Sequence, residues 1–230
     1  MPKLFASKRR LAGRALLAAC AALAPGLQAA HAAEAALDFE RTFAVKEEPA
    51  ALYYKVAFTG AGGSHTLQVW RDGQLRLRRR TDDAVDTYVL REASNLDEYQ
   101  MIVVDYGKRT STQISRNSLV RLGHFSDWFD LAHGLRHPVG PYRLTASQRP
   151  AHAPAPIDKC RWYELRQAGS ADRICWSERD GLPLVIWSER QGAALWRVTQ
   201  VQRQPMADDV FQLHDAGFVR NDANRDIDND

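Results

Sequence analysis

The stretch RICWSERDGLPLVIWSERQGAALWRVTQ, residues 173–200, contains three segments of alternating apolar and polar residues separated by two short turn sequences. Such alternation over a few residues is typical of β-strands that bury one face. The turns are residues 179–181 (RDG) and 190–192 (RQG). Each ends in glycine, which readily adopts the left-handed conformation that closes a three-residue hairpin loop. The stretch therefore predicts an antiparallel meander of three strands.

The length of the loops decides which side chains share a face of this meander. Three-residue loops place Ile186 opposite both Ile174 and Trp196, so that apolar residues meet. Two-residue turns would place Trp187 opposite Trp196 and turn a strand over, because a slip of one residue exchanges the two faces. A turn of the same form at residues 71–73 (RDG) extends the pattern to another hairpin. The same register predicts these further pairs: Trp176 with Leu184, Leu184 with Val198, Val69 with Leu75, and Leu67 with Leu77.

Strand-like segments recur along most of the chain. Aromatic and β-branched content and regular turn signals predict strands at residues 52–59, 65–70, 74–80, 85–91, 99–105, 110–115, 142–147, 160–166, 173–178, 183–190, 194–202 and 210–213. One helix is predicted at residues 126–135, which begin at a candidate N-cap, Ser126, and end near Gly134 and Pro138. Residues 149–158 contain three prolines and predict an extended linker.

One short helix is too small to cover the apolar face of so large a sheet. The sheet must therefore curl on itself, which leaves either a filled core or a cavity between sheet and helix. The predicted fold class is mainly β: a large curled antiparallel sheet, an unclosed half-barrel, with one short helix covering its concave face. The six tryptophans either fill this interior or line a pocket.

The N-terminus has the pattern of an export signal. Five basic residues and no acidic residue are followed by an apolar run at residues 15–27 and by a small-x-small site, AHA, at residues 30–32. This order predicts a periplasmic protein with three parts: a cleaved signal peptide at residues 1–32, a single β domain at 33–220 and a polar flexible tail at 221–230. The alternative is a lipoprotein signal, LAAC, in which Cys20 is lipidated and anchors the chain.

Removal of the signal changes the charge of the chain. The full sequence has 31 basic and 28 acidic residues, and loss of the five basic residues leaves 26 against 28. A net charge of −2 predicts no nucleic-acid partner. A local basic run remains at Arg76, Arg78, Arg79 and Arg80. At strand spacing such a run is typical of a solvated face, and the alternative is a surface that binds a partner chain.

Two cysteines, Cys160 and Cys175, remain after the signal is removed. In an oxidising compartment an even pair in neighbouring predicted strands indicates a structural disulfide. A redox-active pair is the alternative, but the C-x-x-C spacing that lowers a thiol pKa is absent.

Catalytic and metal-binding motifs are weak in this sequence. It contains no G-x-S-x-G elbow, no P-loop and no H-E-x-x-H motif. The best metal candidates are Asp130, His133 and His137, whose spacing could form a helical stripe. Gly134 and Pro138 are expected to end the helix before His137 aligns. The sequence therefore predicts no catalytic residues, no metal site and no cofactor.

The layout of the chain resembles the periplasmic lipoprotein-carrier (LolA/LolB-like) superfamily, including related envelope-stress sensor domains. The resemblance is carried by the export signal, a hairpin of the W-x-D-G-x-L kind at residues 70–75, a helix near Trp128, and an F-x-x-x-x-x-G-F stretch from Phe211 to Phe218. It implies an unclosed barrel with a helix over its concave face and a hydrophobic cavity that holds acyl chains.

The predicted function is that of a periplasmic, non-enzymatic binding protein whose cavity takes a lipid or an acylated ligand. The alternatives are an envelope protein–protein interaction or sensor module without a lipid ligand, and a hydrolase. An envelope protein is a possible partner, and the mature chain is not expected to be an integral membrane protein. The candidate cavity residues are Leu67, Val69, Leu75, Leu77, Ile174, Trp176, Leu184, Ile186, Trp196 and Val198.

Overall fold

The computed structural model describes residues 36–121 and 127–228. The predicted export signal, the lipoprotein alternative at Cys20 and the predicted cap Ser126 lie outside these residues. All the described residues belong to one compact unit. Within the described residues no helix combines the length and the apolar character that a membrane span needs.

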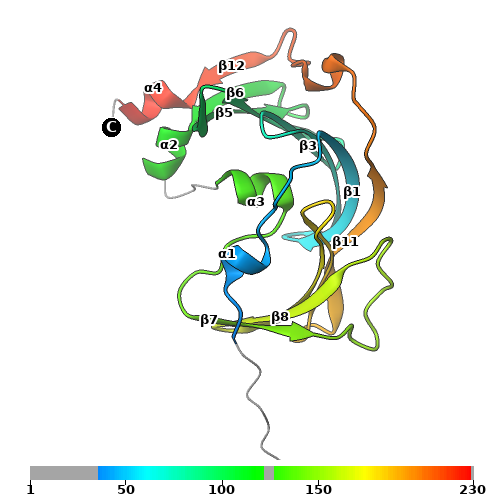
Figure 1. The fold of residues 1–230 in the computed structure, drawn as a ribbon. Coiled ribbons are helices and arrows are strands. Elements are labelled where there is room, and N and C mark those ends of the chain that lie inside the picture. The colour runs from blue at the N-terminus through cyan, green and yellow to red at the C-terminus, as the bar shows by residue number, and fades with distance from the viewer. Residues whose placement is uncertain (1–35, 122–126, 229–230) are drawn as a thin grey trace, which may run out of the picture. The chain divides into compact units, whose positions relative to one another are not determined.

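Twelve strands of the described chain form one sheet, in the order β12-β6-β5-β4-β3-β2-β1-β11-β10-β9-β8-β7. Neighbours are antiparallel except β12 and β6, which are parallel. The sheet is not closed into a barrel, and it curves around α1 and α3 (Figure 1). The strands are β1 (Ala51–Gly60), β2 (Gly63–Asp72), β3 (Arg76–Thr81), β4 (Val85–Glu92), β5 (Asn95–Asp105), β6 (Thr110–Ser115), β7 (Tyr142–Ser147), β8 (Arg161–Gln167), β9 (Ser170–Ser177), β10 (Leu182–Ser188), β11 (Ala193–Gln202) and β12 (Val219–Asp222).

Eleven of the predicted strands correspond to β1–β11. The strand predicted at residues 210–213 is wrong, because a 3-10 turn, η1 (Asp208–Phe211), lies there instead. This segment lies against β3: the Val210 carbonyl accepts a hydrogen bond from Arg78, and Arg76 lies over the ring of Phe211. The twelfth strand, β12, and helix α4 (Ala223–Asp228) occupy most of the segment expected to be a flexible tail.

The helices of the described residues are short. Besides α4 they are α1 (Phe39–Thr42), α2 (Arg116–Arg121) and α3 (Trp128–His133). The side chain of Asp127 caps α3 by accepting a hydrogen bond from Asp130 N, and Gly134 ends it with a φ of 66°. A Cβ on Gly134 would lie 2.7 Å from the Trp196 ring, so this glycine also permits a close approach to the sheet. The helix is therefore shorter than the predicted span, residues 126–135.

The hairpin registers are partly as predicted. Ile186 lies opposite both Ile174 and Trp196, as expected from the apolar pairing. Both loops hold four residues instead of three, and irregularities in the pairing next to them restore the register. One of these irregularities places Trp176 opposite Pro183, so the predicted pairing of Trp176 with Leu184 is wrong.

The β2–β3 hairpin differs more from its prediction. Its loop is residues 73–75, so Leu75 lies in the turn and is 37% exposed. Leu77 lies opposite Arg71, Val69 opposite Arg79 and Leu67 opposite Thr81, so the predicted pairs of Val69 with Leu75 and Leu67 with Leu77 are wrong. Leu67, Val69 and Leu77 nevertheless share the buried face, because the register moves by an even number of residues.

Two apolar clusters fill the concave side of the sheet. The first includes Leu52, Val69 and Trp196, with Leu131 of α3. The second includes Phe39 and Phe43 of the α1 region together with Ile174 and Trp176. Helices α1 and α3 lie inside the curve of the sheet (Figure 1). The predicted disulfide between Cys160 and Cys175 is confirmed, with the two Cα atoms 5.4 Å apart.

Candidate functional site

Nine of the ten candidate cavity residues pack in the two apolar clusters. Eight are buried and Ile186 is half-buried at the border of both clusters, whereas Leu75 belongs to neither. The first cluster contains Leu67, Val69, Leu77, Leu184, Trp196 and Val198, and the second contains Ile174 and Trp176.

Protein side chains cover these residues on the concave side. The Trp176 ring lies 5.1 Å from that of Phe43 and 6.2 Å from that of Phe129. Trp196 donates a hydrogen bond to the Pro183 carbonyl at 2.8 Å, and its ring lies under Gly134. None of the ten residues lines any of four surface grooves of the described residues. The eight buried residues are thus covered by protein side chains, whereas Leu75 is 37% exposed.

The largest of these four grooves lies between residues 37–50 and a wall made by β8, the β9–β10 turn and Arg203, and we call it the basic groove. Its volume is about 880 Å³. Residues 37–50 are fixed at one end, where Leu37 N donates a hydrogen bond to the Leu144 carbonyl of β7. The charged side chains that line the groove are Arg41, Lys46, Glu47, Glu48, Arg161, Glu178, Arg179 and Arg203.

Positive charge is in excess in the basic groove. Arg161 forms an ion pair with Glu178 at 3.0 Å, and Arg203 is held by Asp180 and Asp158. Three exposed cations of the lining, Arg41, Lys46 and Arg179, have side chains that form no hydrogen bond or ion pair within the described residues. Among the acidic lining residues, Glu47 also forms no hydrogen bond or ion pair there. Exposed arginine and lysine side chains that form no ion pair favour the binding of an anionic ligand.

A buried polar cluster, Arg71, His133 and Glu48, lies behind the basic groove. Arg71 is fully buried and donates hydrogen bonds to the carbonyl oxygens of Ala132 at 3.0 Å and Asp180 at 2.9 Å. Its Nη2 lies 3.3 Å from Glu48 Oε2. His133 Nε2 lies 3.0 Å from Glu48 Oε1. The cluster therefore joins α3, the β9–β10 turn and the wall of the groove to β2.

The charge of Glu48 is stabilised within this cluster. Burial raises the pKa of the Glu48 carboxyl, but the hydrogen bond from His133 and the positive charge of Arg71 outweigh it, so the pKa lies below its usual value. Glu48 is therefore ionised at neutral pH. It keeps the wall of the groove fixed instead of compensating the exposed cations.

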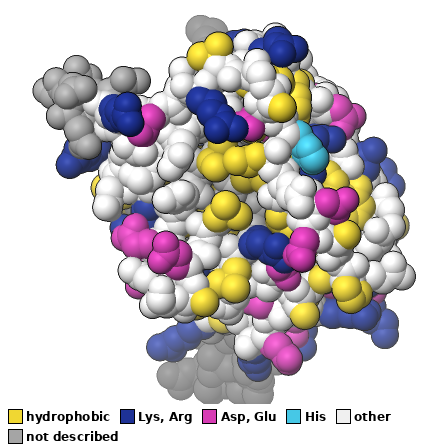
Figure 2. Space-filling view, turned by 90° about the horizontal axis from the view of Figure 1, so that it is seen from above, with side chains coloured by type: hydrophobic (Ala, Val, Ile, Leu, Met, Phe, Trp, Pro, Cys, Tyr) yellow, Lys and Arg dark blue, Asp and Glu magenta, His cyan; other side chains and the backbone are white. Residues whose placement is uncertain are grey.

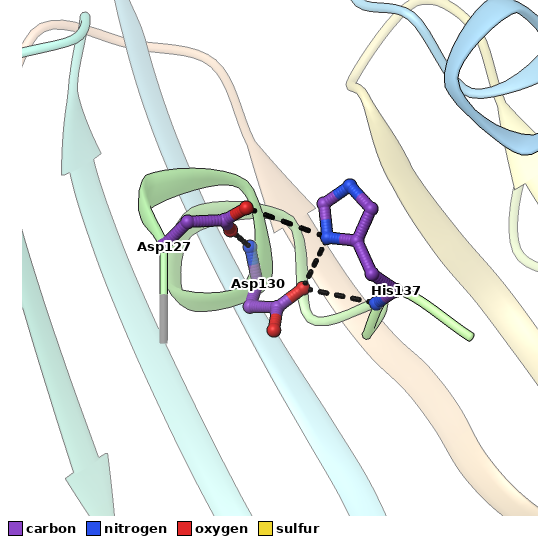
Figure 3. A group of neighbouring side chains, drawn as sticks. All are labelled: Asp127, Asp130 and His137. Atoms are coloured by element: carbon purple, nitrogen blue, oxygen red, sulfur yellow. Dashed lines mark hydrogen bonds and ion pairs between the residues drawn. The ribbon is translucent and has the colours of Figure 1, made fainter. Parts of the chain in front are cut away.

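The metal candidates of the sequence divide between two places. His133 lies in the buried cluster, whereas Asp130 and His137 meet near the N-terminus of α3 together with Asp127 (Figure 3). The helix does end before His137, as expected. The chain then turns back, so that His137 N donates a hydrogen bond to Asp130 Oδ1 at 3.1 Å. Asp127 was missed by the sequence analysis, although aspartate is among the residues preferred at a helix N-cap.

The buried cluster was also missed. Arg71 follows Leu67 and Val69 at intervals of two, which places it on the buried face of β2 and was a usable signal. Glu48 lies in an irregular segment, and nothing in its local sequence indicates burial.

Charges of both signs are interspersed with hydrophobic side chains on the face seen from above (Figure 2), so one sign does not dominate there.

Comparisons with known proteins add little to this description. No family model matches the sequence, and no curated protein matches it. Among solved structures the chain is similar to MucB, known from a crystal structure, at 15% identity and a TM-score of 0.37. The match covers 75% of this chain and 60% of that chain. At this TM-score the likeness supports no conclusion about fold or function, so the resemblance to lipoprotein carriers stays a prediction.

Proposed function

We propose that the chain is an extracytoplasmic, non-enzymatic binding protein that holds an acidic, extended segment of a partner protein in the basic groove. The observation that carries the proposal is the set of three exposed cations, Arg41, Lys46 and Arg179, that line one groove and whose side chains form no hydrogen bond or close ion pair within the described residues. Asp158, which is held by Arg203, also interacts with the charge of Arg179. They supply positive charge and hydrogen-bond donors to whatever lies in the groove.

The size and lining of the basic groove support a peptide segment over an acyl chain. Its volume of about 880 Å³ is sufficient for several residues of an extended chain. Small-molecule pockets are lined mostly by apolar and aromatic side chains. Here the lining is mainly charged and polar, and Leu37 and Tyr163 are among its few large apolar residues.

The disulfide between Cys160 and Cys175 supports the location. Disulfides persist in oxidising compartments and are rare in the cytosol. The predicted export signal at residues 1–32 agrees with this location, and Ala33 is the expected first residue of the mature protein.

A binding experiment with an acidic probe tests the proposal. Fluorescence anisotropy with a labelled peptide of ten glutamates should show binding that weakens as salt is added, because exposed charges are screened. The triple variant Arg41→Glu, Lys46→Glu, Arg179→Glu should lose this binding. The matched control Lys108→Glu, Arg190→Glu, Arg197→Glu makes the same change in charge at exposed positions outside the groove and should retain it.

The same protein preparations test the acyl-chain alternative. If a fluorescent fatty acid binds to the wild type and to the groove variant equally, while the glutamate peptide binds to neither, the lipid function is favoured and the proposal fails. Equal peptide binding by the groove variant and the control would also contradict it, because the attraction would then not come from the groove.

A further inference from the structure

The cluster at the N-terminus of α3 places an imidazole nitrogen between two carboxylates. His137 Nδ1 lies 3.0 Å from Asp130 Oδ1 and 3.4 Å from Asp127 Oδ2 (Figure 3). One ligand atom from each of the three residues lies within 4.8 Å of the others. In a tetrahedral zinc site, bonds of about 2.0–2.1 Å set neighbouring ligand atoms about 3.4 Å apart. Two of the three distances are therefore close to the spacing that one zinc ion requires, and the third, between the two carboxylates, is within 4.8 Å.

The backbone already orients both carboxylates. Asp127 Oδ1 accepts a hydrogen bond from Asp130 N at 2.8 Å, and Asp130 Oδ1 accepts one from His137 N at 3.1 Å. Within the described residues Asp127 Oδ2 accepts no backbone hydrogen bond, and Asp130 Oδ1 has a second lone pair beside the one that accepts from His137 N. Carboxylates that bind metals are commonly held by such outer hydrogen bonds.

The second nitrogen of His137 also has a partner typical of metal sites. Its Nε2 lies 2.9 Å from Glu40 Oε1 of α1. A histidine that binds a metal usually donates its other N–H to a carboxylate, which fixes the ring and raises its basicity. The ring is further held between Phe39 and Phe129, at centroid distances of 5.1 and 5.0 Å.

Charge is unbalanced at this cluster. The three carboxylates of Glu40, Asp127 and Asp130 surround the single imidazole of His137. A divalent cation would neutralise this excess, and the mixture of one imidazole with carboxylates suits zinc better than magnesium.

We propose that Asp127, Asp130 and His137 bind one Zn²⁺ ion, with Glu40 as the carboxylate that orients His137. The ion would join the start of α3 to the segment that follows its end, and through Glu40 to α1. It would thus fasten the two helices that cover the concave face. This inference is independent of the basic groove, whose lining contains none of the four residues.

Isothermal titration of protein purified without a polyhistidine tag tests the site with zinc alone. The wild type should bind one Zn²⁺ per chain, and zinc should raise its thermal unfolding midpoint. The variant Asp127→Asn, Asp130→Asn keeps the helix cap and the acceptor for His137 N, because asparagine caps helices as well as aspartate does. It should fold normally and bind zinc more than tenfold more weakly. Glu40→Gln should weaken binding about tenfold.

His152→Gln is the matched control, since His152 is another exposed histidine outside the cluster, and it should bind zinc as the wild type does. Magnesium in excess should not displace the zinc. If the wild type shows no saturable binding, or if the double asparagine variant binds zinc as tightly as the wild type, the cluster is a histidine–carboxylate ion pair only and the proposal is wrong.

Discussion

Arg71 and Arg78 lie on adjacent strands and are both buried, but they face opposite sides of the sheet and are held differently. On the convex side, Arg78 and Arg80 donate to Asp86, a fully buried carboxylate that also accepts hydrogen bonds from Tyr88 and Tyr106. On the concave side, Arg71 is held mainly by backbone carbonyl oxygens, and its acidic partner Glu48 lies in an irregular segment.

This difference shows which part of the structure each arginine stabilises. All the partners of Asp86 come from strands β3 and β4 or from Tyr106, so its network fixes the sheet itself. Burial raises the pKa of Asp86, but hydrogen bonds from Arg80 and Tyr106 outweigh it and lower the value. Arg71 instead connects β2 to α3 and to the β9–β10 turn. We therefore expect loss of Asp86 to destabilise the whole sheet. Loss of Arg71 should instead loosen the contacts of α3 and the β9–β10 turn with β2.

Asp86→Ala should cause the largest loss of stability. It leaves the charges of Arg78 and Arg80 without their carboxylate, and breaking a buried ion pair costs about 3–5 kcal/mol. Urea unfolding followed by tryptophan fluorescence measures the change. Asp209→Ala, at an exposed position of η1, serves as the control. A loss no larger than that of the control would show that Asp86 does not fix the sheet.

Arg71→Met should cost less, about 3 kcal/mol, because two buried carbonyl oxygens lose a donor while the methionine still fills the space. Hydrogen exchange should rise in residues 127–133 and 178–181 before it rises in β3 and β4. A uniform increase of hydrogen exchange across the sheet would contradict the view that Arg71 holds α3 and the β9–β10 turn against β2.

Glu48→Gln should have the smallest effect, about 1.5 kcal/mol at neutral pH, from the loss of charged hydrogen bonds. The pKa of Glu48 is lowered in the folded protein, so its contribution is present above the unfolded pKa and is lost as the pH falls through the folded pKa. The wild type and the variant should therefore become equally stable in acid. A difference that persists at low pH would assign the effect to packing and not to charge.

The local sequence pattern was sufficient to predict much of the sheet, but not the contacts of the helices and loops that lie on its concave face. Alternation around Ile174, Ile186 and Trp196 predicted one shared face, and the position of Cys160 and Cys175 in neighbouring strands of an exported chain predicted their disulfide. Leu75 was misplaced because the turn formula allows more than one loop position, and only tertiary packing selects among them. A shift by an even number of residues keeps the same face buried, so Leu77 is buried although its predicted partner is wrong.

The site depends on contacts between segments that are distant in sequence. Arg78 and Arg80 were expected on a solvated face, yet Arg78 is 6% exposed because residues 208–211 pack over it. A three-residue loop after Thr81 would have placed Arg80 opposite Asp86, so that pair was within reach of the sequence. The contacts of Glu48 and of Glu40 with histidines near α3 were not, because no local periodicity relates these segments.

The pairing of β1 with β11 also has a consequence for how the chain is made. Tyr54 lies opposite Val201, so this edge of β1 acquires its partner only after the intervening β2–β10 have been made. Until then β1 presents unpaired backbone groups, a ready template for pairing with another chain. Pairings so distant in sequence also form slowly. The joint between β1 and β11 is therefore where newly made protein is most exposed to aggregation, and where a chaperone would be of most use.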